Sequence, residues 1–323
     1  MKYNQKIDFQ AHYLPPTYYE FLDSQGLSMP DGFPTPEWDE EIQKELMADL
    51  GIAFALLTVS SPSLYTKDKQ KTCDFARRVN EEGAQIVSRN LQQLGFIATV
   101  PLPYIEESIA ETIYALDTLN ADGIGLMTNY GGMYLGDSSL EPLMAELNKR
   151  KALVVLHPTE PAVVVPNVCE GMSIPTMEYF FETTRTFSNM VIHDLFERYP
   201  DIKWVLPHAG AFISILADRF DSFALMLRFQ NPTLGVDILK SMAHVYYDVA
   251  GFSEPKQIEM LLRNVAVSHL VYGSDTPYTP IEACIGQTEA LEDTNKLTDE
   301  EKQMVFTTNA LELVPRLKNI MKK

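Results

Sequence analysis

The stretch KIDFQAHYLP (residues 6–15) combines the pattern of a β-strand with that of a metal site. Its apolar residues Ile7 and Phe9 alternate with polar ones up to His12, and two prolines then follow. Side chains two positions apart on a strand point the same way, so Gln10 and His12 would face one side together. A His-x-His pair in this place would supply two metal ligands, but here the first position holds a neutral amide. The stretch therefore raises the question of whether a metal still binds.

Short apolar runs recur along the whole chain. They cover residues 6–12, 53–60, 95–102, 123–128, 153–158, 202–210, 245–250 and 269–277. Most are continuously apolar, as expected for parallel strands that are buried on both faces. Amphipathic helical segments separate them, for instance at 69–90, 104–119, 138–150 and 178–199. The alternation predicts an α/β fold, a (β/α)8 TIM barrel. The alternative, an open doubly wound sheet, lacks a glycine fingerprint after its first strand.

The length of the chain suits a single barrel domain over 1–323, because such barrels take about 250 residues plus insertions. The Pro- and Gly-rich stretch 28–41 predicts a small insertion at about 14–48, after the first strand, which ends in a helix near 38–49. A second insertion, 159–177, is expected after the fifth strand. Both would lie on the C-terminal face, where barrel enzymes place their sites. The segment 298–320, with alternating Lys and Glu, is expected to be a helix with a solvated face.

Composition excludes several classes of partner. A net charge of −18 argues against a nucleic-acid-binding protein, which needs a basic face. The sequence has no apolar signal core and no run near 18 apolar residues, so no membrane association is expected. The three cysteines are odd in number and lack CxxC spacing, which is typical of reduced thiols. We therefore expect a cytoplasmic protein.

Chemically versatile residues stand at the ends of four predicted strands. His12 ends the first strand, His157 the fifth, His208 the sixth and Asp275 the eighth. In a barrel these strand ends converge on one central pocket. Imidazole and carboxylate groups suit zinc or manganese and leave open positions for water or substrate. The pattern therefore predicts a metal site at the C-terminal rim.

The motifs IDFQAH, LHP, PHAG and YGSDTP, in this order on these strands, resemble the amidohydrolase-related family of metal-dependent barrels. That family includes aminocarboxymuconate-semialdehyde decarboxylase and several aromatic acid decarboxylases. The resemblance spans nearly the whole chain. The stretches GFPTPEWDEE, LNADGIGLMTNYGGMYLGDSSLEPLMAELNKR and LVVLHPTEP are similar to the branch typified by 6-methylsalicylate decarboxylase.

The resemblance implies roles for the residues at the strand ends. His12, His157 and Asp275 match the family's metal ligands. His208 matches a histidine that contacts bound water or substrate. Gln10 occupies a ligand position that is His in many members and Glu in some decarboxylases.

Two further residues are candidates for substrate binding. Arg219, eleven residues after His208, matches the spacing of an arginine that some family members contribute to a neighbouring subunit's pocket. This match implies a homodimer or a higher homo-oligomer, but a helix-surface ion pair with Asp218 or Asp221 is an open alternative. Trp38, in the aromatic-rich insertion, either packs against the barrel or lines the substrate pocket.

The family resemblance implies a carboxy-lyase that decarboxylates a small hydroxylated aromatic acid of the 6-methylsalicylate type without oxidation. One divalent ion, Zn or Mn, would be required, and no organic cofactor. Asp275 would give a proton to the ring carbon that bears the carboxylate, and His208 would polarise the oxygen side. Two alternatives stay open. The same metal could support hydrolysis of a lactone, ester or amide, or the barrel could be a metal-depleted binding or scaffold protein, which only Gln10 favours.

Overall fold

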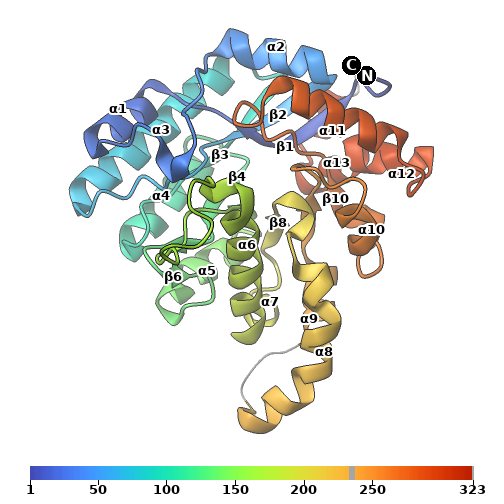
Figure 1. The fold of residues 1–323 in the computed structure, drawn as a ribbon. Helices are drawn as coiled ribbons and strands as arrows, with labels where there is room; N and C mark the ends of the chain where they lie inside the picture. The colour runs from blue at the N-terminus through green and yellow to red at the C-terminus, as the bar shows by residue number, and fades with distance from the viewer. Residues whose placement is uncertain (233–236, 322–323) are drawn as a thin grey trace.

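The computed structural model describes residues 1–232 and 237–321, and its centre is a ring of eight parallel strands (Figure 1). In order around the ring they are β1 (Lys6–His12), β2 (Ile52–Thr58), β3 (Leu94–Ala98), β4 (Gly123–Met127), β7 (Leu153–His157), β8 (Lys203–Leu206), β9 (Tyr246–Asp248) and β10 (Leu270–Val271). Backbone N–H groups of Phe9 and Asp275 donate to the carbonyls of Tyr272 and Gln10, which joins β1 to the segment around β10. The predicted (β/α)8 barrel is confirmed, and each predicted strand is present.

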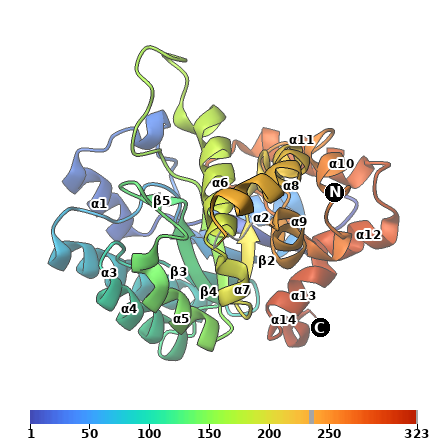
Figure 2. The same cartoon turned by 90° about the horizontal axis from the view of Figure 1, so that it is seen from below.

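Helices surround the ring of strands (Figure 2). Those between β2 and β7 are α3 (Lys69–Arg89), α4 (Ile105–Asp117) and α5 (Glu141–Lys149). Between β7 and β10 lie α6 (Ile174–Ile192), α7 (Leu195–Arg198), α8 (Ile213–Gln230), α9 (Ile238–His244) and α10 (Gln257–Leu261). After β10 come α11 (Ile281–Asp293), α12 (Asp299–Gln303), the π-helical turn η5 (Met304–Thr308), α13 (Asn309–Leu313) and α14 (Leu317–Ile320).

Two connections are longer than a simple strand–helix unit. The stretch 14–48, interpreted above as an insertion, contains α1 (Pro16–Gln25), the 3₁₀ turn η1 (Pro30–Gly32) and the start of α2 (Glu40–Leu50). The Asp39 carboxylate starts α2 by accepting the backbone N–H groups of Glu41 and Ile42. After β7 the chain runs without a helix until α6 begins at Ile174. Both connections lie on the side of the barrel where the strands end.

A small hairpin, β5 (Asn129–Tyr130) and β6 (Met133–Tyr134), follows β4 and was not predicted. Its turn residues Gly131 and Gly132 both have positive φ, at 62° and 95°. Two consecutive residues of this kind form a tight hairpin turn, and glycine adopts such angles without steric cost. The GG pair in NYGGMY was the available sequence signal.

The N-terminal end of the barrel is closed by the last helices of the chain. Ala310, Leu313 and Leu317 pack in one buried cluster with Ile7 and Phe9 of β1. The expectation of a continuous solvated helix over 298–320 was therefore wrong, because this region is broken into several segments and one side of it is buried. Its apolar side completes the core that the strands leave open at this end.

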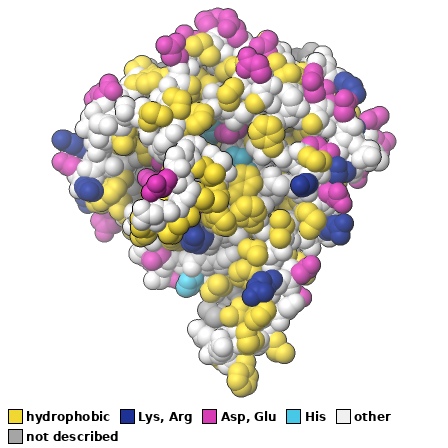
Figure 3. Space-filling model, viewed as in Figure 1, with side chains coloured by type: hydrophobic (Ala, Val, Ile, Leu, Met, Phe, Trp, Pro, Cys, Tyr) yellow, Lys and Arg dark blue, Asp and Glu magenta, His cyan; other side chains and the backbone are white. Residues whose placement is uncertain are grey.

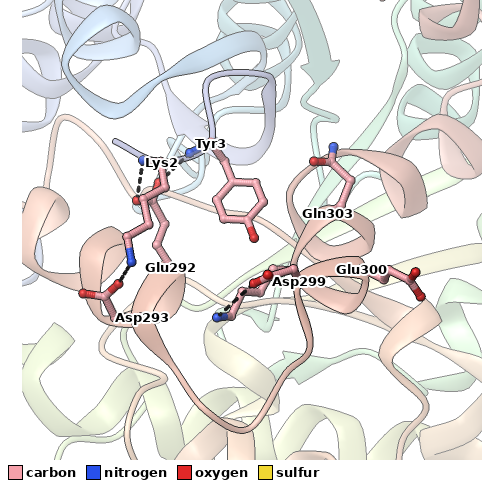
Figure 4. A pocket seen from close by; sticks show the side chains of 8 residues that line it. Lys2, Tyr3, Glu292, Asp293, Asp299, Glu300 and Gln303 are labelled. Atoms are coloured by element: carbon pink, nitrogen blue, oxygen red, sulfur yellow. Dashed lines mark hydrogen bonds and ion pairs between the residues drawn. The ribbon is translucent and has the colours of Figure 1, made fainter.

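A buried ion pair lies beside this closure. The Lys6 ammonium is 2.8 Å from a Glu292 carboxylate oxygen, and both side chains are buried. Lys6 also donates to the backbone carbonyl of Leu50 at 2.9 Å. Figure 4 shows the surface hollow next to the pair, where the backbone N–H of Lys2 donates to Glu292 and the Lys2 ammonium meets Asp293. These contacts tie the N-terminal segment to α11.

No helix within residues 1–232 and 237–321 has the length and apolar character needed to cross a membrane.

Candidate metal centre and active site

Three of the predicted site residues meet at the C-terminal rim. His12 and His157 are the last residues of β1 and β7, and Asp275 follows β10. One ligand atom from each lies within 4.8 Å of the other two. Both histidines are buried, and the Asp275 side chain is 18% exposed. The parallel strands bring residues that are far apart in sequence to one edge, as the barrel fold requires.

The two histidines of this cluster are oriented by backbone carbonyls. His12 Nδ1–H donates to the carbonyl of Thr58 at 3.2 Å, and His157 Nδ1–H donates to that of Pro158 at 2.7 Å. Such bonds orient both rings with Nε2 toward the cluster, which is the usual arrangement around a metal-binding imidazole. Burial holds the pKa of His157 well below its ordinary value, so its ring is neutral, as a metal ligand must be. The donor set therefore fits a divalent cation.

Asp275 is held between the two sides of the cluster. Its Oδ1 is 3.1 Å from His12 Nε2, while Oδ2 accepts the Thr279 hydroxyl at 2.9 Å and lies 3.8 Å from His208 Nε2. Burial alone would raise the pKa of this carboxyl group, but hydrogen bonds from His12 and His208 outweigh it and hold the pKa well below its usual range. Asp275 is therefore ionised in the free protein, as a metal-binding carboxylate would be.

Gln10 lies at the same cluster and contacts its neighbours through both ends of the amide. One end is 3.2 Å from His208 Nε2 and 3.3 Å from Asp275 Oδ1. The orientation that satisfies His208 and Asp248 places the amide oxygen at this end, where it accepts from His208, and the NH₂ group on the carboxylate of Asp248 at 2.8 and 2.9 Å. In that orientation an uncharged oxygen faces the cluster of possible ligands.

Asp248 is a site residue that the sequence analysis missed. It ends β9, is fully buried, and accepts the backbone N–H groups of His208 at 2.9 Å and Ala250 at 3.2 Å. Burial raises the pKa of Asp248 to about 7. Its signal in the sequence was the acidic residue within the seventh apolar run, 245–250, comparable to Asp275 within the eighth.

His208 sits on a strained backbone beside the cluster. His208, Ala209 and Ala211 have φ values of 55°, 51° and 54°, a region that residues with a side chain rarely adopt. Its ring stacks on Phe180 with centroids 5.6 Å apart. The His208 ring also packs closely against Gly251, where an added Cβ would lie 2.6 Å from His208 Cδ2. Strain of this kind persists only where the surrounding structure holds it, and it is common at functional sites.

A cavity of about 380 Å³ opens directly onto these residues. Its base is formed by Ser60, His157, His208, Asp275 and Tyr278, and its apolar wall by Pro30, Phe33, Pro175, Phe180 and Phe252. Figure 3 shows a hollow near the middle of this face with a histidine and an acidic side chain inside it. Among the described residues, no Lys or Arg lines the cavity. Its volume is in the range of small-ligand sites.

Trp38 and Arg219 lie outside this cavity in the single chain. The Trp38 indole donates to Gln43 at 3.0 Å and its ring meets Tyr13 edge-on at 5.9 Å, so its contacts are packing contacts. Arg219, on α8, lies over the ring of Phe223 at 5.0 Å. Within the described part of the chain it forms no ion pair with the neighbouring aspartates of α8, which was the alternative left open above.

A parallel barrel with two imidazoles and a carboxylate at its C-terminal rim defines a class of metal-site barrel enzymes. The profile of the amidohydrolase family matches residues 7–316, and the chain belongs to that family. The 6-methylsalicylic acid decarboxylase of Penicillium expansum is 34% identical over 325 residues, which cover 98% of this chain and 98% of the relative. The family resemblance drawn from the motifs is thus confirmed.

Solved structures agree with this family. A crystal structure described as amidohydrolase II superimposes with a TM-score of 0.92 at 40% identity, over 96% of this chain and 100% of that one. A dihydroxybenzoic acid decarboxylase from Polaromonas, solved with manganese and the inhibitor 2-nitroresorcinol, gives a TM-score of 0.83 at 18% identity, over 98% of both chains. At that identity the likeness is one of fold alone.

Proposed function

We propose that this protein is a metal-dependent carboxy-lyase that decarboxylates a small hydroxylated aromatic acid of the 6-methylsalicylate type. The observation that carries the proposal is a cavity with an aromatic wall whose lining includes His157 and Asp275, two members of the cluster that they form with His12. It is supported by full-length relatives at 32–34% identity, two of which are named 6-methylsalicylic acid decarboxylases. Fold alone would not support a substrate class, because one barrel hosts many chemistries.

One divalent ion, Zn or Mn, would be held by His12, His157 and Asp275, with the amide oxygen of Gln10 as a weak additional ligand. No organic cofactor is part of the proposal. When bound, the ion would act as a Lewis acid that orients the carboxylate and hydroxyl oxygens of the acid and stabilises the charge that develops on them. Since no described Lys or Arg lines the cavity, this ion is also the positive charge that the substrate carboxylate needs.

The chain's own groups handle the proton. Asp275 gives a proton to the ring carbon that bears the carboxylate, the bond from that carbon to the carboxylate breaks, and its electron pair restores the aromatic ring as carbon dioxide leaves. Asp275 is ionised in the free protein, so it must first gain the proton. His208 is placed to supply it, since its Nε2 lies 3.8 Å from Asp275 Oδ2. Hydrogen bonding to Asp275 raises the pKa of His208 despite burial, which favours the protonated form of this ring.

The aromatic wall of the cavity suits the rest of such a substrate. Phe33, Phe180 and Phe252 would face the ring and an alkyl substituent, while the oxygens face the polar base. Burying a ring against these side chains favours binding in proportion to the apolar area removed from water.

The proposed assembly is a homodimer or a higher homo-oligomer. Helix α8 projects from the barrel (Figure 1), and its side chains Leu225 and Phe229 are 82% and 88% exposed. Large apolar side chains gathered on a projecting element are typical of a surface that another chain covers. A second copy would place Arg219, on the same helix, beside a neighbouring subunit's pocket.

The test has two steps. Elemental analysis of purified protein after metal supplementation should find about one divalent ion per chain. Carbon dioxide release should then be detected with 6-methylsalicylate or a related 2-hydroxybenzoate, and a chelator should abolish it. Release of carbon dioxide from none of these acids, together with cleavage of a lactone, ester or amide, would refute the decarboxylase.

A further inference from the structure

The turn η1 forms part of the cavity wall and is packed against the segment that precedes α6. Pro30, the first residue of the turn, and Phe33, which follows the turn, line the cavity. A Cβ at Gly32 would lie 3.5 Å from the Cα of Ser173, which also lines it. Asp31, in the middle of the turn, has φ 55° and ψ 22°. Aspartate and asparagine are among the few residues with a side chain that adopt these angles readily.

The Asp31 carboxylate joins this turn to two other parts of the wall. Its Oδ2 accepts the Ser61 hydroxyl at 2.5 Å and the Tyr179 hydroxyl at 2.5 Å. Ser61 follows β2 and Tyr179 belongs to α6, and both line the cavity. Because the one hydroxyl hydrogen of Ser61 goes to Asp31, the Thr159 hydroxyl must be the donor in its 2.6 Å contact with Ser61. One carboxylate therefore connects the segments after β1, β2 and β7 with α6.

The same groups lie next to the candidate metal ligand His157. The Tyr179 ring meets the His157 ring edge-on with centroids 5.9 Å apart. The Ser60 hydroxyl, one residue before Ser61, is 3.4 Å from His157 Nε2. A shift of Tyr179 or of the Ser60–Ser61 segment would thus change the cavity beside the metal cluster, although Asp31 itself acts only through these neighbours.

We propose that Asp31 is a positioning residue that holds η1, Ser61 and Tyr179 as one hydrogen-bonded wall, and that this wall sets the affinity for the ring of the aromatic acid. The inference rests on the proposed function for the identity of the ligand. Hydrogen bonds to an ionised carboxylate are short and about twice as strong as those between neutral groups. The wall contacts the ring rather than the reacting carboxylate, so it binds ground state and transition state alike, and its loss should appear in KM rather than in kcat.

The experiment compares the metal-loaded wild type with Asp31→Asn. Asparagine tolerates the same backbone angles but carries no charge, so the turn is kept while both hydrogen bonds weaken. We expect KM for 6-methylsalicylate and the dissociation constant for salicylate, measured by calorimetry, to rise about tenfold. The value of kcat should stay within about threefold and the metal content should not change. Asp39→Asn is the matched control, because it is the same substitution at the start of α2. There the Asp39 side chain accepts hydrogen bonds from backbone N–H groups only.

A double-mutant cycle separates positioning from a general loss of stability. Tyr179→Phe alone should raise KM in the same direction, and combining it with Asp31→Asn should add less than the product of the two single effects. An unchanged KM and an unchanged salicylate dissociation constant in Asp31→Asn would overturn the positioning role while leaving the decarboxylase intact. Conversely, if the wild type binds salicylate in an Asp31-dependent way but releases no carbon dioxide, the proposed reaction fails and the positioning role stands.

Discussion

The two ends of the barrel treat buried polar groups in opposite ways. At the N-terminal end, Lys6 is paired with Glu292, and apolar side chains of α13 and α14 close the core. At the C-terminal rim, burial raises the pKa of Asp248 to about 7, and the backbone at His208 has positive φ. His208 Nδ1 is buried without a hydrogen-bond partner among the described residues. His208 thus combines a strained backbone with an unsatisfied buried atom at the rim, which favours a stabilising role for one end and a chemical role for the other.

Asp275→Asn should have the largest effect of these substitutions. It should lower turnover at the rim and leave the rest of the fold unchanged. An amide cannot shuttle the proton, so we expect kcat to fall by about a thousandfold or more. Circular dichroism and urea unfolding should show that the fold is kept. The control is Asp293→Asn, the same change at an exposed site on α11. Turnover near the wild-type rate in Asp275→Asn would contradict the assignment of function to this end.

Glu292→Gln should act on stability and not on turnover. Burial alone would raise the pKa of Glu292, but the hydrogen bond and charge of Lys6 outweigh it, so the pKa lies below its ordinary value of 4.5. A depressed carboxyl pKa stabilises the folded state above pH 4.5, and this contribution is lost as the pH falls through the folded-state pKa. We expect the variant to be about 3 kcal/mol less stable near neutral pH, because a buried ammonium loses its partner.

The measurement is urea unfolding at pH 7 and at pH 4. The variant should show a shallower loss of stability between these values than the wild type. Asp293→Asn, which removes the exposed partner of Lys2, should change little. An equal loss of stability in both variants would mean that the buried pair has no special role at the N-terminal end.

Gly251→Ala tests whether turnover at the rim depends on the position of the His208 ring. The added methyl group would meet the His208 ring at 2.6 Å, and the backbone there has φ 72°. We expect kcat to fall by about a hundredfold, since displacing a catalytic group by about 1 Å costs this much. Gly131→Ala separates the two causes, because its φ is 62° but nothing lies within 4 Å of its Cβ position. Similar losses in both variants would attribute the effect to backbone strain alone.

Gln10→Glu should have the smallest effect of these substitutions, and it should strengthen metal binding at the rim rather than weaken it. It places a charged oxygen where the neutral amide now lies, at nearly constant volume. We expect the affinity for Zn or Mn to rise about tenfold, because ligand charge is one of the quantities that set metal affinity. Gln5→Glu adds the same charge at an exposed site near the N-terminal end of the same strand and should leave metal affinity unchanged. If the two variants bind metal equally well, Gln10 lies outside the coordination sphere.

The barrel could be predicted because most of its strands are continuous apolar runs, and four of them end in a recognisable residue. His12, His157, His208 and Asp275 converge because parallel strands all end at one edge, so strand position alone was sufficient. The broken C-terminal region was harder to predict. Its pattern of charged residues resembles that of a surface helix. Which of its side chains are buried depends on the open end of the barrel that this region covers.

Asp248 and Asp31 could not be recognised for different reasons. Asp248 carried the same strand-end signal as Asp275 but lay outside the motifs that drew attention to the other residues. Asp31 is one acidic residue in a turn, and its role depends on Ser61 and Tyr179, which are distant in the sequence. Hydrogen bonds between distant segments leave no periodicity or spacing in the chain, so only the folded structure reveals them.

The absence of Lys and Arg from the described cavity lining also concerns how the acid reaches the site. The chain carries a net charge of −18, and an anionic substrate is therefore repelled as it approaches. Dissolved salt screens this repulsion, because the Debye length falls to about 8 Å at physiological ionic strength. The second-order rate constant kcat/KM should accordingly increase with ionic strength, opposite to the behaviour of enzymes that steer their substrates electrostatically. If the proposed acid is the substrate, the acidic surface of this protein slows their encounter, and the positive charge that captures the acid would be that of the metal ion held by the proposed ligands.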